Sequence, residues 1–101
     1  MGYRPHHILD YQVKIGREVG SKDIEYTLTF DEVTNTLEEA KIHYHIQEDE
    51  HIINYESLMD FNTNAIYPIT PKSIAIINDL QEVASKCDYA KREGEYRIWW
   101  F

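Results

Sequence analysis

The sequence predicts a single α+β domain: an antiparallel sheet in the element order ββββ-α-β, with one helix packed on the apolar face of the sheet. Two observations lead to this prediction. Apolar and polar residues alternate along much of the first half of the chain, and after residue 69 the apolar residues instead recur at intervals of three or four. The chain has 101 residues, and a chain of this size buries roughly two-thirds of the surface that its unfolded form exposes. We therefore expect residues 1–101 to form one domain.

Four strands are expected in the first part of the chain. Every second residue is apolar in three segments, which predicts strands with one buried and one solvated face. These segments are 9–15, 24–30 and 40–46. The turn-forming sequences GSKD (20–23) and VTNT (33–36) separate them, so the three strands should form an antiparallel meander. A fourth strand is expected from about Ile53.

A helix is expected from Thr70 to Cys87. Thr70 is a good N-cap, and Pro71 suits the first helical position. The apolar residues that follow share one helical face, which should lie on the sheet. They are Ile74, Ile77, Leu80, Ala84 and Cys87, and the stripe is widened by Ile76 and Val83.

The C-terminal sequence YRIWWF (96–101) is expected to form the last strand. Alternation predicts two faces, with Tyr96, Ile98 and Trp100 on the helix side and Trp99 and Phe101 on the other. Two large aromatic side chains exposed together would form a patch of the kind that marks interaction sites. The alternative is that the loop at 62–69 or the N-terminal arm covers them.

The N-terminus and the cysteine content bear on the location of the protein. Residues 1–7, which include RPHH, are expected to form an exposed N-terminal arm. The single cysteine excludes a disulfide within the chain and fits a reducing compartment. No segment has the apolar run of a signal peptide or the roughly 20 apolar residues of a membrane span. We therefore expect a cytoplasmic protein without membrane contact.

The acidic charge is concentrated in the middle third of the chain. The net charge is −8, and residues 36–62 contain seven acidic residues and one lysine. Such a charge repels the phosphates of nucleic acid, so direct binding of nucleic acid is not expected. It attracts basic protein surfaces, although a charge of this size also keeps a small domain soluble without any partner. The candidate binding residues are Glu25, Glu38, Glu39, Glu48, Asp49, Glu50 and Glu56 on the acidic surface, and Trp99 and Phe101 in the aromatic patch.

The sequence KIHYHIQEDEH (41–51) raises the question of a metal or catalytic site. His43 and His45 share the polar side of a predicted strand, where pairing with charges on neighbouring strands accounts for them by structure alone. A zinc ion needs three or four ligands, with His51 as the third candidate, but the spacing is loose and cysteine ligands are missing. A small hydrolase or nuclease that uses the His43/His45 face is the enzymatic alternative. We expect neither a metal nor a cofactor.

These features predict a small acidic protein-binding module rather than an enzyme. The module would inhibit or neutralise another protein by covering a basic surface sterically and electrostatically, as immunity proteins, antitoxin-like inhibitors and phage anti-defence proteins do. This analogy concerns the profile of a small, acidic domain and not its fold. A homodimer or larger structural homo-oligomer joined through the C-terminal strand is a further alternative.

Overall fold

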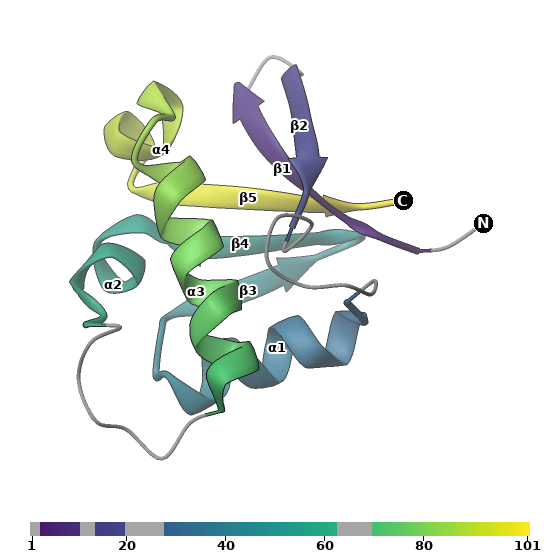
Figure 1. Ribbon diagram of the computed structural model, residues 1–101. Coiled ribbons are helices and arrows are strands. Elements are labelled where there is room, and N and C mark those ends of the chain that lie inside the picture. The colour runs from purple at the N-terminus through teal and green to yellow at the C-terminus, as the bar shows by residue number, and fades with distance from the viewer. Residues whose placement is uncertain (1–2, 11–13, 20–27, 63–69) are drawn as a thin grey trace.

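The C-terminal strand lies in the middle of a five-stranded antiparallel sheet with the strand order β2-β1-β5-β4-β3 (Figure 1). The computed structural model describes residues 3–10, 14–19, 28–62 and 70–101. The elements are β1 (Pro5–Asp10), β2 (Lys14–Glu18), α1 (Phe30–Glu39), β3 (Tyr44–Gln47), β4 (Glu50–Asn54), α2 (Tyr55–Asp60), α3 (Pro71–Ala84), α4 (Asp88–Glu93) and β5 (Glu95–Trp100). The predicted class, an α+β domain with an antiparallel sheet, is confirmed.

Two hairpins, β1–β2 and β3–β4, flank β5 on its two sides. The centre of β5 pairs with both of them, because Ile98 lies opposite His7 of β1 and His51 of β4. The two ends of the chain therefore meet: the backbone N–H groups of Arg4 and Phe101 each donate to the other residue's carbonyl, both at 3.0 Å. Both backbone edges of β5 are thus paired within the chain.

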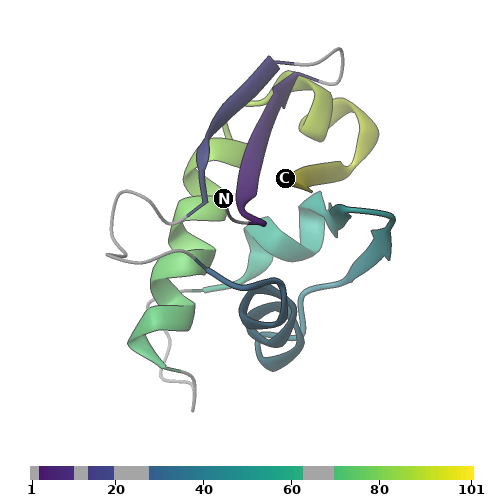
Figure 2. The ribbon, with the colours of Figure 1, turned by 90° about the vertical axis from the view of Figure 1, so that its right-hand side faces the viewer.

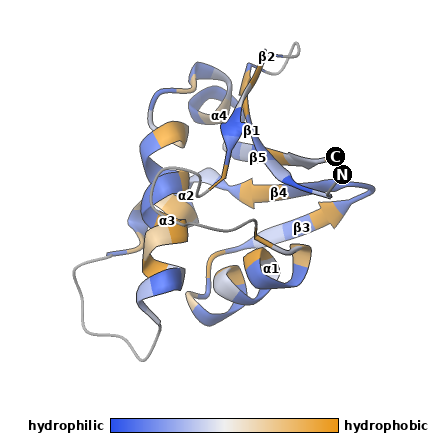
Figure 3. Ribbon diagram, turned by 45° about the vertical axis from the view of Figure 1, so that its right-hand side comes forward, coloured by the Kyte–Doolittle hydropathy of each residue, from blue (hydrophilic) through white to orange (hydrophobic). Residues whose placement is uncertain are grey.

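The core lies between the sheet and α3, which crosses one face of the sheet, while α1 lies close to the β3 edge (Figures 1 and 2). Apolar residues are frequent on α3 and on the strands that it covers (Figure 3). Ile53, Ile77, Leu80, Tyr96 and Ile98 are fully buried in this layer. Burying large apolar side chains contributes about 1.5–3 kcal/mol each, so this layer is the main source of stability.

The predicted helix is confirmed from its first residue. The Thr70 hydroxyl accepts from the Ser73 backbone N–H at 3.1 Å, and Pro71 occupies the first turn. The helix ends at Ala84, and Cys87 lies beyond it as the buried N-cap residue of α4. None of the helices among the described residues is long and apolar enough to cross a membrane.

The N-terminal part differs from the prediction in two ways. The alternating segment 9–15 is not one strand, because β1 ends at Asp10 and β2 begins at Lys14. The expected arm at 1–7 is wrong from Pro5 onward, since these residues belong to β1 and His7 is fully buried. The hairpin is tight: a Cβ atom on Gly16 would lie 2.9 Å from Leu9 Cγ. Alternation that continues through a hairpin turn therefore concealed the reversal of the chain.

A helix, α1, replaces the second predicted turn. Residues 24–27 of the predicted second strand lie outside the described residues, and Phe30 already begins α1. The sequence TFDE (29–32) forms a capping box: Thr29 Oγ1 accepts from the Glu32 N–H, and Glu32 accepts from the Thr29 N–H. VTNT (33–36) is therefore helical, and the element order is ββαββαααβ instead of ββββ-α-β.

The third and fourth strands are present but shifted along the chain. The third is limited to Tyr44–Gln47, and the fourth starts earlier than predicted, at Glu50. Asn54 ends the fourth strand because its side chain caps α2, accepting from the Ser57 N–H at 2.7 Å. The β3–β4 hairpin that results places its turn beside the C-terminus of the chain (Figure 1).

Candidate functional site

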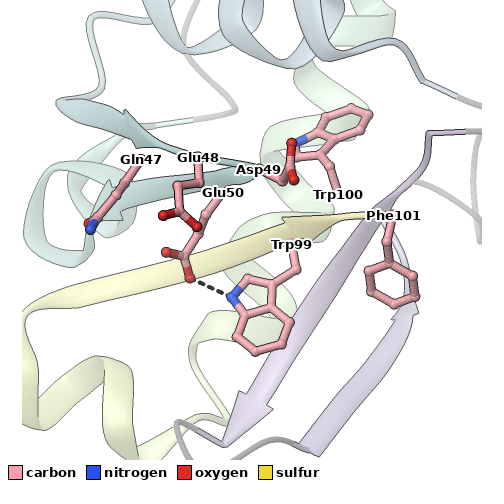
Figure 4. Close-up of a pocket in the computed structure, with 7 residues that line it drawn as sticks. All are labelled: Gln47, Glu48, Asp49, Glu50, Trp99, Trp100 and Phe101. Atoms are coloured by element: carbon pink, nitrogen blue, oxygen red, sulfur yellow. Dashed lines mark hydrogen bonds between the residues drawn. The ribbon is translucent and has the colours of Figure 1, made fainter.

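The turn of the β3–β4 hairpin lies against the end of β5 and forms a hollow with it. Glu50 lies directly opposite Trp99, and the backbone N–H of Trp100 donates to the Asp49 carbonyl at 2.8 Å. The hollow has a volume of about 380 Å³ (Figure 4). We call it the acidic–aromatic hollow; its side chains are Glu48, Asp49, Glu50, Trp99 and Phe101, with Gln47 and Trp100 also contributing to its lining. Five of the predicted binding residues thus meet in one place.

Trp99 and Phe101 lie on the side of β5 opposite to Trp100, as the alternation predicts, and Trp99 still packs partly against the core. Trp100 is 2 % exposed, whereas Trp99 is only partly buried and Phe101 is 55 % exposed. The ring of Phe101 stacks on His6, with centroids 4.0 Å apart and planes 11° apart. The indole of Trp99 donates to Glu50 (Figure 4). Both rings therefore offer aromatic surface to solvent in a defined orientation.

The three carboxylates of the hollow differ in their partners. Glu50 accepts from Arg97 Nη1 at 3.0 Å as well as from Trp99. Asp49 accepts from the Tyr3 hydroxyl at 2.5 Å, and this hydrogen bond raises the pKa of Tyr3 to about 12. The Glu48 carboxylate makes no hydrogen bond or ion pair with any residue that the structure describes. Glu48 is thus the carboxylate of the turn that is available to a partner.

The backbone of Glu48 is in the left-handed region, with φ of 55°. Glycine and asparagine dominate this region in hairpin turns, because a Cβ atom there approaches the following carbonyl oxygen. A glutamate at this position costs about 1–2 kcal/mol relative to a residue that adopts the conformation freely. Strained residues cluster at functional sites. Lys41, which does not line the hollow, shares this conformation with φ of 58°, so the place of Glu48 in the hollow, together with its conformation, makes its exposed side chain the leading functional candidate.

The rest of the predicted acidic surface lies elsewhere. Glu38 and Glu39 are in the last turn of α1, and Glu56 is in the first turn of α2. These residues lie toward the end of the β3–β4 hairpin opposite its turn, and Glu38 accepts from the Tyr44 hydroxyl at 2.6 Å. Glu25 lies outside the described residues. The predicted acidic residues therefore do not form one continuous surface.

The histidines of the segment 41–51 do not come together either. His43 and His45 are exposed, whereas His51 is fully buried in β4 instead of in a turn. The register pairs His45 with Ile52 and Ile46 with His51, so His45 and His51 point to opposite faces of the hairpin. Among the residues that the structure describes, no three His, Cys, Asp or Glu side chains are placed to hold a metal ion. The weak alternative of a site made of His43, His45 and His51 therefore lacks the required geometry.

The sequence prediction missed a series of buried side chains joined by hydrogen bonds, His7 of β1, Asp79 of α3 and Tyr96 of β5. We call these three side chains the buried polar chain. Asp79 of α3 accepts from His7 Nε2 at 2.9 Å and from Arg17 Nη2, while His7 Nδ1 shares a hydrogen bond of 2.5 Å with the Tyr96 hydroxyl. His7, Asp79 and Tyr96 are all buried, and burial raises the pKa of Tyr96. One signal was present: Asp79 lies three residues after Ile76 and four before Val83, which places a carboxylate on the apolar stripe of the helix.

Comparisons of the chain with protein-family models, with curated proteins and with solved structures gave no match. The acidic–aromatic hollow combines acceptors for a cation with aromatic faces and is accessible to solvent. The buried chain of His7, Asp79 and Tyr96 is closed to a protein partner.

Proposed function

We propose that this protein binds a basic surface of another protein through the acidic–aromatic hollow and thereby inhibits or neutralises it. One observation carries the proposal: the carboxylate of Glu48, which has no partner among the described residues, lines the same hollow as the partly buried Trp99 and the exposed Phe101. A carboxylate beside an aromatic face suits the guanidinium of arginine or the ammonium of lysine. The partner would insert one basic side chain at this point.

The contacts around Trp99 favour binding because they are already formed in the free protein. The Trp99 indole is held by Glu50, which is itself held by Arg97. Ordering a large side chain on binding costs about 0.5–1.5 kcal/mol, and this cost is reduced when the side chain is fixed beforehand. Tryptophan in such a setting is a common energetic centre of protein interfaces.

The charge of the chain supports the association step. A net charge of −8 attracts a basic partner over a distance, and attraction of this kind raises association rates. The same charge opposes direct binding of nucleic acid. A protein that covers a basic surface would also exclude other anions from it, which is the basis of inhibition by occlusion. We place this activity in the cytoplasm, because the one cysteine of the chain needs no oxidising compartment.

The geometry gives less support to the two alternative functions, an enzyme and a homo-oligomer. The His43 and His45 imidazoles make no hydrogen bond or ion pair with the described residues, so the hydrolase or nuclease alternative lacks a positioned partner group. A homo-oligomer cannot form by strand pairing through β5, since both edges of β5 are paired within the chain. Association of two copies would have to use the exposed aromatic rings or the edge strands β2 and β3.

The test is the association rate of the protein with a labelled peptide of alternating arginine and glycine, measured by stopped flow at low and at physiological salt. Glu48→Lys should slow association about tenfold at low salt, because it reverses the charge at the contact. Glu39→Lys makes the same change of net charge on an exposed position of α1 and serves as the matched control. Equal slowing by both substitutions would mean that only the overall charge matters and would refute the hollow as the contact. Absence of binding to the peptide at low salt would refute the proposal itself.

A further inference from the structure

A second hollow lies between the β1–β2 hairpin and the C-terminal part of α3. Its volume is about 550 Å³, within the range of pockets that hold small molecules. Leu9 of β1, Val83 of α3 and Cys87 give it an apolar wall. Burial raises the pKa of the Cys87 thiol, so that this side chain acts as a small apolar group and not as a nucleophile.

The charged side chains of this hollow are mainly basic. Among the residues that the structure describes, Lys14, Arg17 and Lys86 line it together with one carboxylate, that of Asp10, although the chain as a whole carries −8. Lys86 is exposed, and its ion pair with Glu82 is long, at 4.0 Å, which leaves its ammonium available. The charged side chains that line the hollow are therefore mainly basic, while the carboxylates of Asp79 and Glu82 lie next to Arg17 and Lys86.

Arg17 is held in place by the buried polar chain described above. Its Nη2 donates to Asp79, which His7 holds at 2.9 Å, and Tyr96 in turn bonds His7. Burying a carboxylate costs desolvation free energy, and a buried salt bridge therefore contributes little net stability to the fold. Charged groups that are supported in this way and border a hollow are frequent at functional sites. The buried chain therefore fixes the orientation of a guanidinium at the wall of the hollow.

The guanidinium of Arg17 retains hydrogen-bonding capacity that the protein does not use. Its Nη1 is shielded from solvent and has no hydrogen-bond partner among the described residues, while the side chain as a whole is 34 % exposed. A buried donor without a partner is unfavourable. A small movement of the side chain toward the hollow would let Nη1 reach an anionic ligand bound there while Nη2 stays on Asp79.

The geometry points to a site for a small organic carboxylate in this hollow, and this inference is independent of the proposed protein-binding function. The carboxylate would bind Arg17, with Lys14 and Lys86 adding charge at the rim, and its apolar part would contact Leu9 and Val83. A planar guanidinium matches a carboxylate in shape. The carboxylate of Asp10 at the rim disfavours ligands with several negative charges. Inorganic phosphate has no apolar part that could contact the apolar wall, so it should bind less well than an organic carboxylate.

The experiment is a titration of the whole chain, followed by the backbone NMR signals of the β1–β2 hairpin, with acetate, butyrate and hexanoate as the probes. Hexanamide is the neutral control, and phosphate is the anion without an apolar part. We expect saturable binding of hexanoate, weaker binding of the shorter acids, and no saturation with hexanamide or phosphate. Binding of hexanamide as tight as that of hexanoate, or tighter binding of phosphate, would overturn the inference, and so would the absence of saturation with all of the probes.

Substitutions locate the site. Arg17→Gln should weaken hexanoate binding about tenfold, as expected for the loss of a hydrogen bond to a charged group. Because this change also leaves Asp79 with one partner fewer and can affect folding, Lys14→Gln provides a second test that spares the buried chain; it should weaken binding a few-fold. Lys91→Gln removes the same charge from an exposed position of α4 outside the hollow and is the matched control. An equal effect of Lys14→Gln and Lys91→Gln would contradict the assignment.

Discussion

The indole nitrogen of Trp100 donates a hydrogen bond of 2.8 Å to Nδ1 of His51 in the core. An indole N–H can only donate, so Nδ1 must be unprotonated and the ring proton must lie on Nε2. Nε2 is 2.8 Å from Thr34 Oγ1, to which it donates. The structure thus requires a neutral His51, and burial lowers the pKa of His51 from 6.5 to about 4.

This arrangement predicts a loss of stability in mild acid. The pKa of His51 is lower in the folded than in the unfolded protein, so its contribution to stability is complete above about pH 6.5 and declines as the pH falls to about 4. The full loss is about 3 kcal/mol, from the energy of one pKa unit. The measurement is the free energy of unfolding in urea between these pH values, for the wild type and for His51→Gln. The loss caused by His51 is the difference between the pH dependences of the two proteins. His45→Gln, which removes an exposed imidazole, is the control for the loss of a histidine; the same pH dependence in both variants would contradict the prediction.

Glu48 should show opposite effects on stability and on binding. Glu48→Asn places a residue that tolerates the left-handed conformation at φ of 55° and should raise the free energy of unfolding by about 0.5–1 kcal/mol. It also removes the carboxylate and should weaken binding of the arginine peptide. Glu48→Gln removes the charge without relieving the backbone, so it should weaken binding without stabilising the protein. Unfolding curves and peptide titrations of the two variants separate these effects. The prediction is wrong if Glu48→Asn raises the free energy of unfolding no more than Glu48→Gln does.

The capping box of α1 predicts a defined cost for its removal. Thr29→Ala eliminates the acceptor for the Glu32 N–H and should lower the free energy of unfolding by about 1 kcal/mol. Thr29→Ser keeps the hydroxyl and should cost much less. Thermal unfolding compares the two. Similar losses from Ala and Ser would show that the methyl group of Thr29, and not its hydroxyl, is what matters.

The buried polar chain predicts unequal effects for two chemically identical substitutions. Tyr96→Phe removes the buried partner of His7 Nδ1 and should destabilise the protein by about 1–3 kcal/mol. Tyr44→Phe removes an exposed hydrogen bond to Glu38 and should have an effect below about 0.5 kcal/mol. Chemical denaturation of the two variants and of the wild type measures the change in the free energy of unfolding that each substitution causes. Equal effects would mean that the bond between Tyr96 and His7 adds nothing to stability.

The sequence predicted α3 and β5 well, for physical reasons, but it did not predict the short helices α2 and α4. Thr70 and Pro71 mark the start of α3 by local chemistry, and the apolar stripe fixes which side of α3 is buried. In β5 the alternation correctly separated the buried Trp100 from the partly exposed Trp99. Signals of this kind depend only on near neighbours in the chain.

The errors in the N-terminal half arise where the same pattern fits two structures. Alternation from Leu9 to Ile15 is compatible with one long strand and with a hairpin, and the chain in fact reverses after Asp10. The segment 29–36 contains both turn-forming residues and the capping box, and the helix forms because its apolar residues Val33 and Leu37 become fully buried. In both segments tertiary packing determines which of the two structures forms.

Neither hollow could be located from the sequence alone. Glu48 and Trp99 line one hollow because β5 pairs with β4, and His7 meets Asp79 across 72 positions of the chain. The order of strands in a sheet is a long-range property that alternation does not encode. Most of the side chains that line the first hollow were nonetheless among the candidates taken from the sequence, because an acidic turn and an outward aromatic pair are each local features.

Binding of a basic partner in the acidic–aromatic hollow can be tested with the two tryptophans as internal reporters. Their indole N–H groups give separate NMR signals, one from Trp99 in the hollow and one from Trp100 in the core. The measurement is a titration of the ¹⁵N-labelled protein with the arginine–glycine peptide at physiological salt. We expect a saturable shift of the Trp99 indole signal together with the amide signal of Glu48, while the Trp100 indole signal stays in place. Saturable shifts around Glu38, Glu39 and Glu56 with an unchanged Trp99 signal would contradict it and would move the contact to the other end of the hairpin.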